Sequence, residues 1–202
     1  PRWTIIDQIN EFFEVQPISP DAPFIDEDVS ILMVVHPKQL PKKTQYAVDQ
    51  FVMRGGKALV FVDPVAEADA PPRNMSRQPA GKSYFTDVLK AWGLQMRKGM
   101  VAGDMESARR VNVRVGTQMA VTDYVAWLSL RPGNFDRQDP AMGELKLINV
   151  GTAGILDTVK DATTTITPLI RTSMRSMAID AAQFAGRPDV LGLFRGFKPV
   201  GG

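Results

Sequence analysis

The strongest constraint on the fold is the stretch 28–64, which has the pattern of a complete strand, helix and second strand. The apolar run at 29–35 is rich in β-branched residues and stops at His36, which favours a buried strand. From 42 to 54, apolar residues recur at helical spacing with polar residues between them, as in an amphipathic helix. A second apolar run at 58–62 predicts another buried strand and completes the unit.

This unit predicts a candidate binding site. Two strands joined by a crossover helix almost always lie parallel, so both end on the same edge of one sheet. Open α/β sheets bind ligands at that edge. His36 and Lys38 follow the first strand and Asp63 follows the second, so we expect these residues to bind a ligand or partner. Asp104, just after a predicted strand at 94–102, is the fourth candidate and would give a carboxylate pair with Asp63.

The second half of the chain has the pattern of a β-rich extension. Apolar and polar residues alternate at 111–115, and 124–130 is also strand-like, so these two segments are expected to form an antiparallel pair. A third strand is predicted at 145–150. It runs into the small residues Gly-Thr-Ala-Gly at 151–154, which lack the full glycine fingerprint of a phosphate loop, and a tight turn or a continuation of the strand is favoured over phosphate binding.

We therefore expect one α/β domain over residues 1–202, with a mostly parallel sheet flanked by helices. Its core is predicted at 1–104 and its β-rich extension at 105–202. A polar, proline-rich stretch at 65–81 is predicted to be a long loop, either a functional lid or a mobile segment. Helical periodicity returns at 82–92.

Composition excludes several kinds of chemistry. The 202 residues include no cysteine and a single histidine. This removes disulfides, thiol catalysis, sulfur-ligated metals and a histidine-rich metal site, and we expect neither a cofactor nor a metal. The formal charge is +2 with scattered lysines and arginines, so nucleic acid is not an expected partner. No apolar run approaches the roughly 20 residues that span a bilayer. The termini suggest a piece excised from a longer protein.

Two alternatives remain open from the residues alone. One is a hydrolase-like enzyme that uses His36 and Asp63 in the same cleft. It requires the two side chains to converge within hydrogen-bonding reach, directly or through one water. The other is a structural spacer or oligomerisation domain, which predicts no polar pocket at the strand ends and an extended apolar surface elsewhere.

Four segments together resemble one protein family: HPKQL at 36–40, YAVDQFVMRGGKALVFVDP at 46–64, LKAWGL at 89–94 and INVGTAG at 148–154. The chain is similar to the auxiliary component of a class of uncharacterised ABC transporters, a group that includes a gliding-motility-associated transport protein. The most specific portion is the run that begins at Asp49 and ends at Pro64. The resemblance covers roughly residues 3–173.

The resemblance implies a bacterial periplasmic or otherwise extracytoplasmic domain whose parent protein is anchored in the inner membrane. The implied partners are an ABC permease and ATPase, and the implied fold is similar to flavodoxin-like or class I glutamine amidotransferase-like domains. It carries over no catalytic residues, and the lack of cysteine removes the amidotransferase nucleophile. We therefore expect a non-enzymatic accessory domain that binds a partner protein, or a ligand such as a glycan or lipid-linked polymer, at the C-terminal edge of the sheet.

Overall fold

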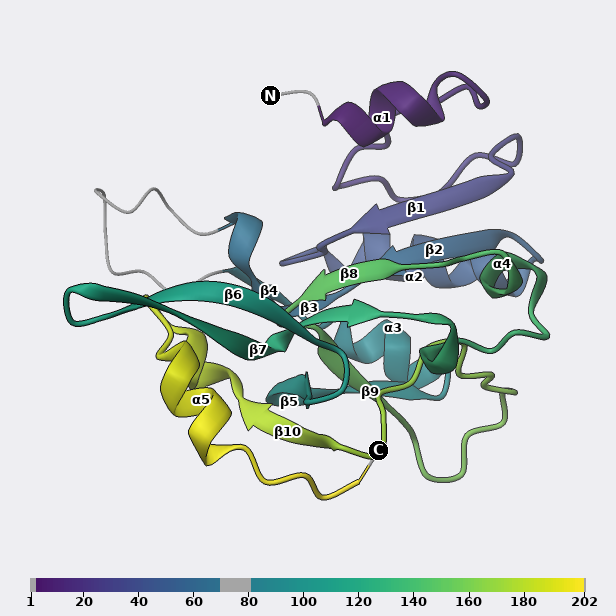
Figure 1. Cartoon of the computed structure of the whole chain (residues 1–202). Coiled ribbons are helices and arrows are strands. Elements are labelled where there is room, and N and C mark those ends of the chain that lie inside the picture. The colour runs from purple at the N-terminus through teal and green to yellow at the C-terminus, as the bar shows by residue number, and fades with distance from the viewer. Residues whose placement is uncertain (1–2, 70–80, 202) are drawn as a thin grey trace. The chain divides into compact units, whose positions relative to one another are not determined.

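The computed structural model describes residues 3–69 and 81–201 (Figure 1). The chain divides into two compact units. The first comprises Pro1–Val34 and Gln39–Leu59, and the second comprises Val35–Lys38 and Val60–Gly202. The core and extension limits expected from the sequence stay a prediction.

The first unit contains the predicted strand, helix and strand. It holds α1 (Thr4–Ile9), α2 (Lys42–Met53) and most of β1 (Ile31–Val35) and β2 (Lys57–Phe61). β1 and β2 pair in parallel, as the crossover helix between them requires. The unit expected at 28–64 is therefore confirmed to within one or two residues at the strand and helix ends.

The apolar stripe of α2 forms the centre of this unit. Gly55 ends the helix in the left-handed region at φ +96°, and a Cβ on Gly56 would lie only 2.5 Å from the ring of Phe51. The Arg54 guanidinium lies 5.3 Å from the centroid of the same ring, within the range of a cation–π contact. The two glycines and the flat guanidinium therefore let the chain turn back tightly over the side chain of Phe51, which is 1% exposed. The helix buries Thr44, Ala47, Val48 and Phe51.

The second unit is built from antiparallel sheets. One pair of strands and two three-stranded sheets, with β5 and β7 at their centres, make up its sheet structure among the described residues. The strands are β3 (Asp63–Ala66) with β4 (Gly81–Ser83), β5 (Leu94–Asp104) between β9 (Gly154–Thr158) and β10 (Ser176–Asp180), and β7 (Gln118–Leu130) between β6 (Ala108–Val115) and β8 (Ile148–Gly151).

Short helices complete this unit, and α5 packs against β7. Val101 of β5 and Val125 and Ala126 of β7 are fully buried, and β5 and β7 contact each other, so the core lies where these central strands meet. The helices are η1 (Glu67–Asp69), α3 (Thr86–Ala91), η2 (Pro132–Asn134), α4 (Pro140–Gly143), η3 (Ala181–Phe184) and α5 (Val190–Gly196).

The expectation of a mostly parallel, flavodoxin-like or amidotransferase-like sheet is wrong. Among the strands of residues 3–69 and 81–201, only β1 and β2 are parallel, and the others pair antiparallel. A parallel crossover needs a dozen or more residues. β6 and β7 are joined by only Gly116 and Thr117, with Gly116 at φ +62°, which makes a tight hairpin (Figure 1). β6 and β7 form the antiparallel pair expected in the second half, but 111–115 lies opposite 118–122, the early part of β7, and not opposite 124–130.

Two local expectations also need correction. The helix expected at 82–92 begins only at Thr86, because the residues before it pair with β3 as strand β4. The loop expected at 65–81 contains the end of β3 and the helix η1, and its residues 70–80 lie outside the described part of the chain.

Candidate ligand-binding site

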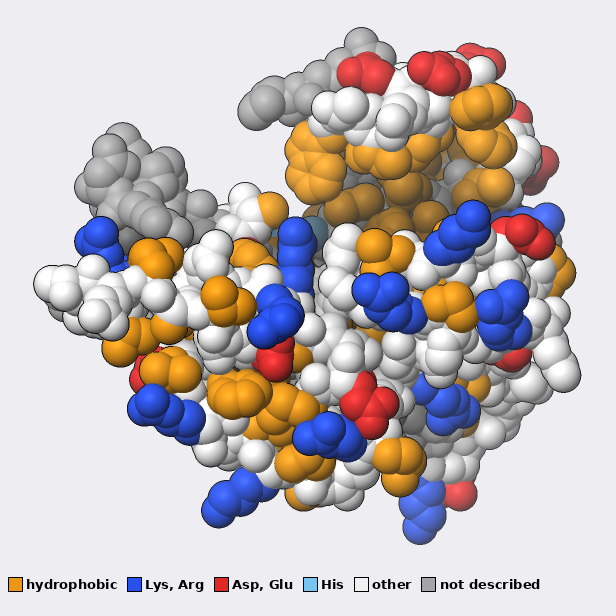
Figure 2. Space-filling view, in the orientation of Figure 1, with side chains coloured by type: hydrophobic (Ala, Val, Ile, Leu, Met, Phe, Trp, Pro, Cys, Tyr) orange, Lys and Arg blue, Asp and Glu red, His pale blue; other side chains and the backbone are white. Residues whose placement is uncertain are grey.

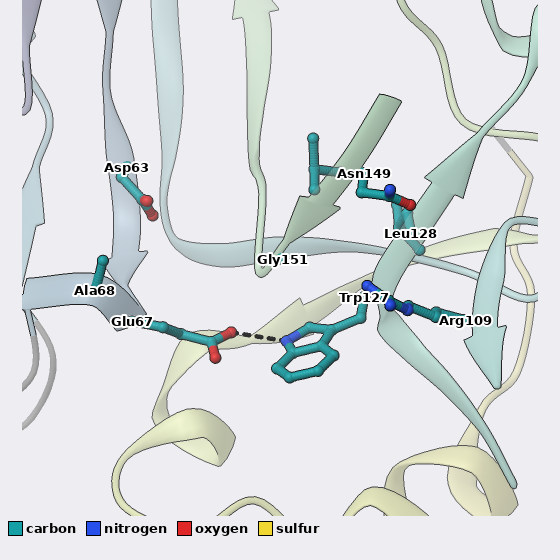
Figure 3. Close-up of a pocket in the computed structure, with 9 residues that line it drawn as sticks. Asp63, Glu67, Ala68, Arg109, Trp127, Leu128, Asn149 and Gly151 are labelled. Atoms are coloured by element: carbon teal, nitrogen blue, oxygen red, sulfur yellow. Dashed lines mark hydrogen bonds between the residues drawn. The ribbon is translucent and has the colours of Figure 1, made fainter. Parts of the chain in front are cut away.

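A pocket of about 400 Å³ lies in the second unit, between β3 and η1 on one side and β6, β7 and β8 on the other (Figure 3). Its volume is within the range of roughly 300–1,000 Å³ that is typical of small-molecule sites. Charged, amide and aromatic side chains surround it. It is lined by Asp63, Glu67, Ala68, Arg109, Trp127, Leu128, Asn149, Val150 and Gly151.

The indole ring of Trp127 is held from two sides. Its Nε1–H donates to Oε1 of Glu67 over 2.9 Å, and in Figure 3 these two side chains point toward one another. The ring of Tyr124 lies against the indole with centroids 5.0 Å apart and planes tilted by 32°. Because an edge and a neighbouring ring both fix the indole, its orientation is set before any ligand arrives.

A strained turn supports the same carboxylate. Thr152 follows β8, is 1% exposed and has φ +45°, which is unusual for a β-branched residue. Its Oγ1 lies 3.0 Å from Glu67 Oε1 and 3.0 Å from the Val65 carbonyl oxygen, and its N–H donates to Ala126 over 2.8 Å. Strain of this kind persists only where the surroundings over-determine it, and it clusters at functional sites.

The residue before this turn packs closely against the indole and the carboxylate. A Cβ on Gly151 would lie 3.2 Å from Trp127 Nε1 and 3.4 Å from Glu67 Oε1. The Gly-Thr-Ala-Gly segment expected to be a tight turn therefore also forms part of the pocket wall. The sequence interpretation of this segment as a turn gave no indication that it would line a pocket.

One carboxyl group that lines the pocket, that of Asp63, has a raised pKa. Burial raises the pKa of Asp63 above its ordinary value, and the negative charge of Glu67 acts in the same direction. The N–H of Val65, which donates to Asp63 Oδ1 over 2.8 Å, and the charge of His36 act against this rise. Burial, followed by the charge of Glu67, also raises the pKa of the Tyr124 hydroxyl.

A second polar cluster lies around β3 and β4. Nδ1 of His36 lies 2.8 Å from Oγ of Ser83, and the same oxygen accepts the main-chain N–H of Asp63 over 3.1 Å. Oδ2 of Asp69 is 3.6 Å from His36 Nε2 and 2.5 Å from Lys38 Nζ. The hydrogen bond from Lys38 is the main reason that the pKa of Asp69 is lowered. The structure thus gathers three of the predicted residues around β3 and β4.

His36 and Asp63 form no direct hydrogen bond with each other among the described residues. His36 contacts Ser83, and the Asp63 carboxylate accepts from Val65. Ser83, which links them, is 1% exposed, so its hydroxyl is closed to a substrate. The described residues also contain no group of three or more His, Cys, Asp or Glu side chains placed to hold a metal ion.

Asp104, the fourth predicted residue, lies away from the pocket lining. It is 0% exposed, and its carboxylate accepts the N–H groups of Glu106, Ser107 and Ser173. Ser173 also donates its hydroxyl to Asp104 over 2.7 Å. These contacts give Asp104 a structural role at the end of β5, and its role in binding stays a prediction.

Sequence reasoning missed most of the pocket. Glu67, Arg109, Trp127 and Asn149 come from separate segments, and no local motif connects them.

On the face shown in Figure 2, lysine and arginine side chains are interspersed with uncharged surface and form no continuous basic patch. In the described part of the chain, no helix has both the length and the apolar character needed to cross a membrane.

The fold and the site define a mixed α and β domain with a preformed polar and aromatic pocket. The model of the family described as an ABC-type uncharacterized transport system matches residues 1–201. The chain therefore belongs to this family of auxiliary components of ABC transport systems, as its sequence resemblance predicted, and the match extends past residue 173. No curated protein and no solved structure matches the chain.

Proposed function

We propose that this chain is a non-catalytic, extracytoplasmic accessory domain that binds a ligand or partner protein at the pocket beside β3. Its bacterial parent is anchored in the inner membrane and works with an ABC permease and ATPase. The observation that carries this proposal is the family match over residues 1–201, which assigns the chain to an ABC transport system. The gliding-motility branch of the family stays a prediction.

The site supports binding more than catalysis. Asp63, predicted from its position after β2, lines the pocket, whereas the imidazole of His36 contacts a buried serine. A catalytic base needs its partner within hydrogen-bonding reach. Among the described residues His36 forms no direct hydrogen bond with Asp63, and the hydroxyl that His36 does contact, that of Ser83, is buried. A purely structural spacer predicts no polar pocket at these strand ends, and the pocket therefore favours binding over that alternative.

Association with a transporter is tested by affinity purification. The full-length parent is isolated from detergent-solubilised native membranes, and the co-purifying proteins are identified by mass spectrometry. We expect an ABC ATPase and permease. A soluble parent recovered without them contradicts the proposal. Repeating the purification with Trp127→Ala separates the two binding modes, since a transporter subunit seated in the pocket is lost and a small ligand leaves the complex intact.

Location is tested by labelling, because this chain has no cysteine. Any other cysteines of the parent protein are first replaced by serine. The substitution Asp189→Cys then introduces a single thiol at an exposed position. A membrane-impermeant maleimide is expected to label this thiol in intact spheroplasts. Labelling only after lysis contradicts an extracytoplasmic location. A cytoplasmic protein that carries an exposed cysteine serves as the control for membrane integrity.

A further inference from the structure

The partly buried indole of Trp127 offers a flat apolar surface in the pocket. One ring neighbour, Tyr124, supports it, and Glu67 fixes its N–H edge. Because these contacts already orient the indole, stacking a ligand on it costs little further side-chain entropy. A ligand matched to this surface has a flat apolar face of its own.

The groups around the indole present both acceptors and donors. Asp63 uses Oδ1 for the N–H of Val65, and Glu67 uses Oε1 for Trp127 and Thr152. Oδ2 of Asp63 and Oε2 of Glu67 have no hydrogen bond to other described residues. These two oxygens are the acceptors on the side of β3 and η1.

Donors lie on the opposite wall. Asn149 accepts the Ser129 hydroxyl through Oδ1 over 2.8 Å, which leaves its amide N–H groups for a ligand. The exposed guanidinium of Arg109 forms no ion pair within residues 3–69 and 81–201. It adds up to five N–H donors. The pocket thus pairs a carboxylate wall with a donor wall across an aromatic surface.

We infer that this pocket binds a neutral sugar ring, which stacks on Trp127 and places hydroxyls between the two walls. Each hydroxyl both donates and accepts, so one ring serves the carboxylates of Asp63 and Glu67 as well as the donors of Arg109 and Asn149. An anion is repelled by the two carboxylates, whereas an organic cation is attracted by them and repelled by Arg109, so the cation is kept as a competing probe in the test. The inference rests on the proposed function for its view that the pocket captures a ligand.

The test uses the 202-residue chain labelled with 5-fluorotryptophan, which gives one fluorine signal for each of Trp3, Trp92 and Trp127. Single tryptophan-to-phenylalanine variants assign the signals. The probes are free glucose, galactose, mannose, N-acetylglucosamine, cellobiose and N,N′-diacetylchitobiose. At least one sugar is expected to shift the Trp127 signal saturably and to leave the Trp92 signal in place.

Matched variants separate the pocket from nonspecific effects. Arg109→Ala and Asn149→Ala are each expected to weaken Kd about five- to tenfold, the effect of losing one or two ligand hydrogen bonds. Arg110→Ala is the control, because this neighbour on β6 lies outside the pocket lining and is 3.8 Å from Asp123. It is expected to leave Kd unchanged. All variants are compared with wild type by circular dichroism.

Three results overturn the inference: no sugar shifts the Trp127 signal, the shift survives both pocket substitutions, or lysine or glycine betaine shifts it where the sugars do not. The result of the co-purification experiment is interpreted independently of the sugar-binding result. Recovery of the ATPase and permease without sugar binding removes only the sugar assignment. Sugar binding without those partners removes the transporter role and leaves a sugar-binding pocket.

Discussion

The substitution Asp104→Asn tests whether the Asp104 carboxylate stabilises the fold, because a structural role predicts a loss in the free energy of unfolding. Asp104 Oδ1 accepts the N–H groups of Glu106 over 2.8 Å and Ser107 over 3.2 Å, and Oδ2 accepts that of Ser173 over 2.5 Å. Asparagine replaces one of these oxygens with an NH₂ group. Whichever way the amide is oriented, at least one main-chain N–H then faces a donor in a site that is 0% exposed.

The size of the effect follows from these contacts. Losing a charge-assisted hydrogen bond costs about 1.5–3 kcal/mol, and an unsatisfied buried donor costs about 1–3 kcal/mol. A neutral amide is easier to bury than a carboxylate, which reduces the loss. We therefore expect Asp104→Asn to lower the free energy of unfolding by about 3 kcal/mol. Asp104→Ala, which removes both acceptors, is expected to cost about 5 kcal/mol.

The assay is urea unfolding in a Trp3→Phe background, so that Trp92 and Trp127, both in the second unit, supply the fluorescence. The midpoint should fall with an unchanged denaturant slope. Asp189→Asn is the control, because its exposed carboxylate caps α5 through Gly192 and asparagine caps as well. We expect it to stay within about 0.5 kcal/mol of the background protein. If Asp104→Asn also stays within that margin, the structural role is refuted.

Three further predictions address single side chains. Asp63→Asn should stabilise the chain at pH 7 by less than about 1 kcal/mol, because burial raises the Asp63 pKa and solvent screens the cost. The gain should disappear as pH falls through that raised pKa, which urea midpoints at several pH values would show. Phe51→Ala should cost about 3–5 kcal/mol by chemical unfolding followed by circular dichroism, against about 0.5 kcal/mol or less for the 64%-exposed Tyr46→Ala. Gly151→Ala should displace the Trp127 indole N–H resonance in NMR spectra and weaken sugar binding, and an unmoved resonance would contradict the close approach.

The local unit at 28–64 could be predicted because its information is local. The apolar run, the helical stripe and the Gly55 stop each lie within a few residues, and the structure confirms all three. The step from this unit to a whole parallel sheet failed because later strands pair antiparallel, as in the tight hairpin of β6 and β7 at Gly116. Pro64, which follows the second predicted strand, lies within β3, whose pairing with β4 is irregular between Asp63 and Ala66. A short, irregular edge strand tolerates the missing N–H.

The pocket could be predicted only in part, for a different physical reason. Trp127 and Glu67 are 60 residues apart in sequence, and their hydrogen bond exists only after β3 and β7 have been brought together. Periodicity placed Trp127 on a strand without revealing which face or partner it would have. Asp63 could be proposed from the sequence because its position after a buried strand is a local feature.

Open α/β sheets bind ligands where their parallel strands end, and Asp63, two residues after β2, lines the candidate pocket although most of the sheet structure is antiparallel. His36 donates its main-chain N–H to Phe61 over 2.9 Å, so the ends of β1 and β2 meet as expected. The chain then enters β3, where Asp63 uses its N–H for Ser83 and turns its carboxylate to the pocket. Two strands suffice to fix that edge. The opposite wall of the pocket comes from antiparallel strands, so Asp63 lines this pocket although the sheet expected around it was wrong, and its role in binding stays a prediction.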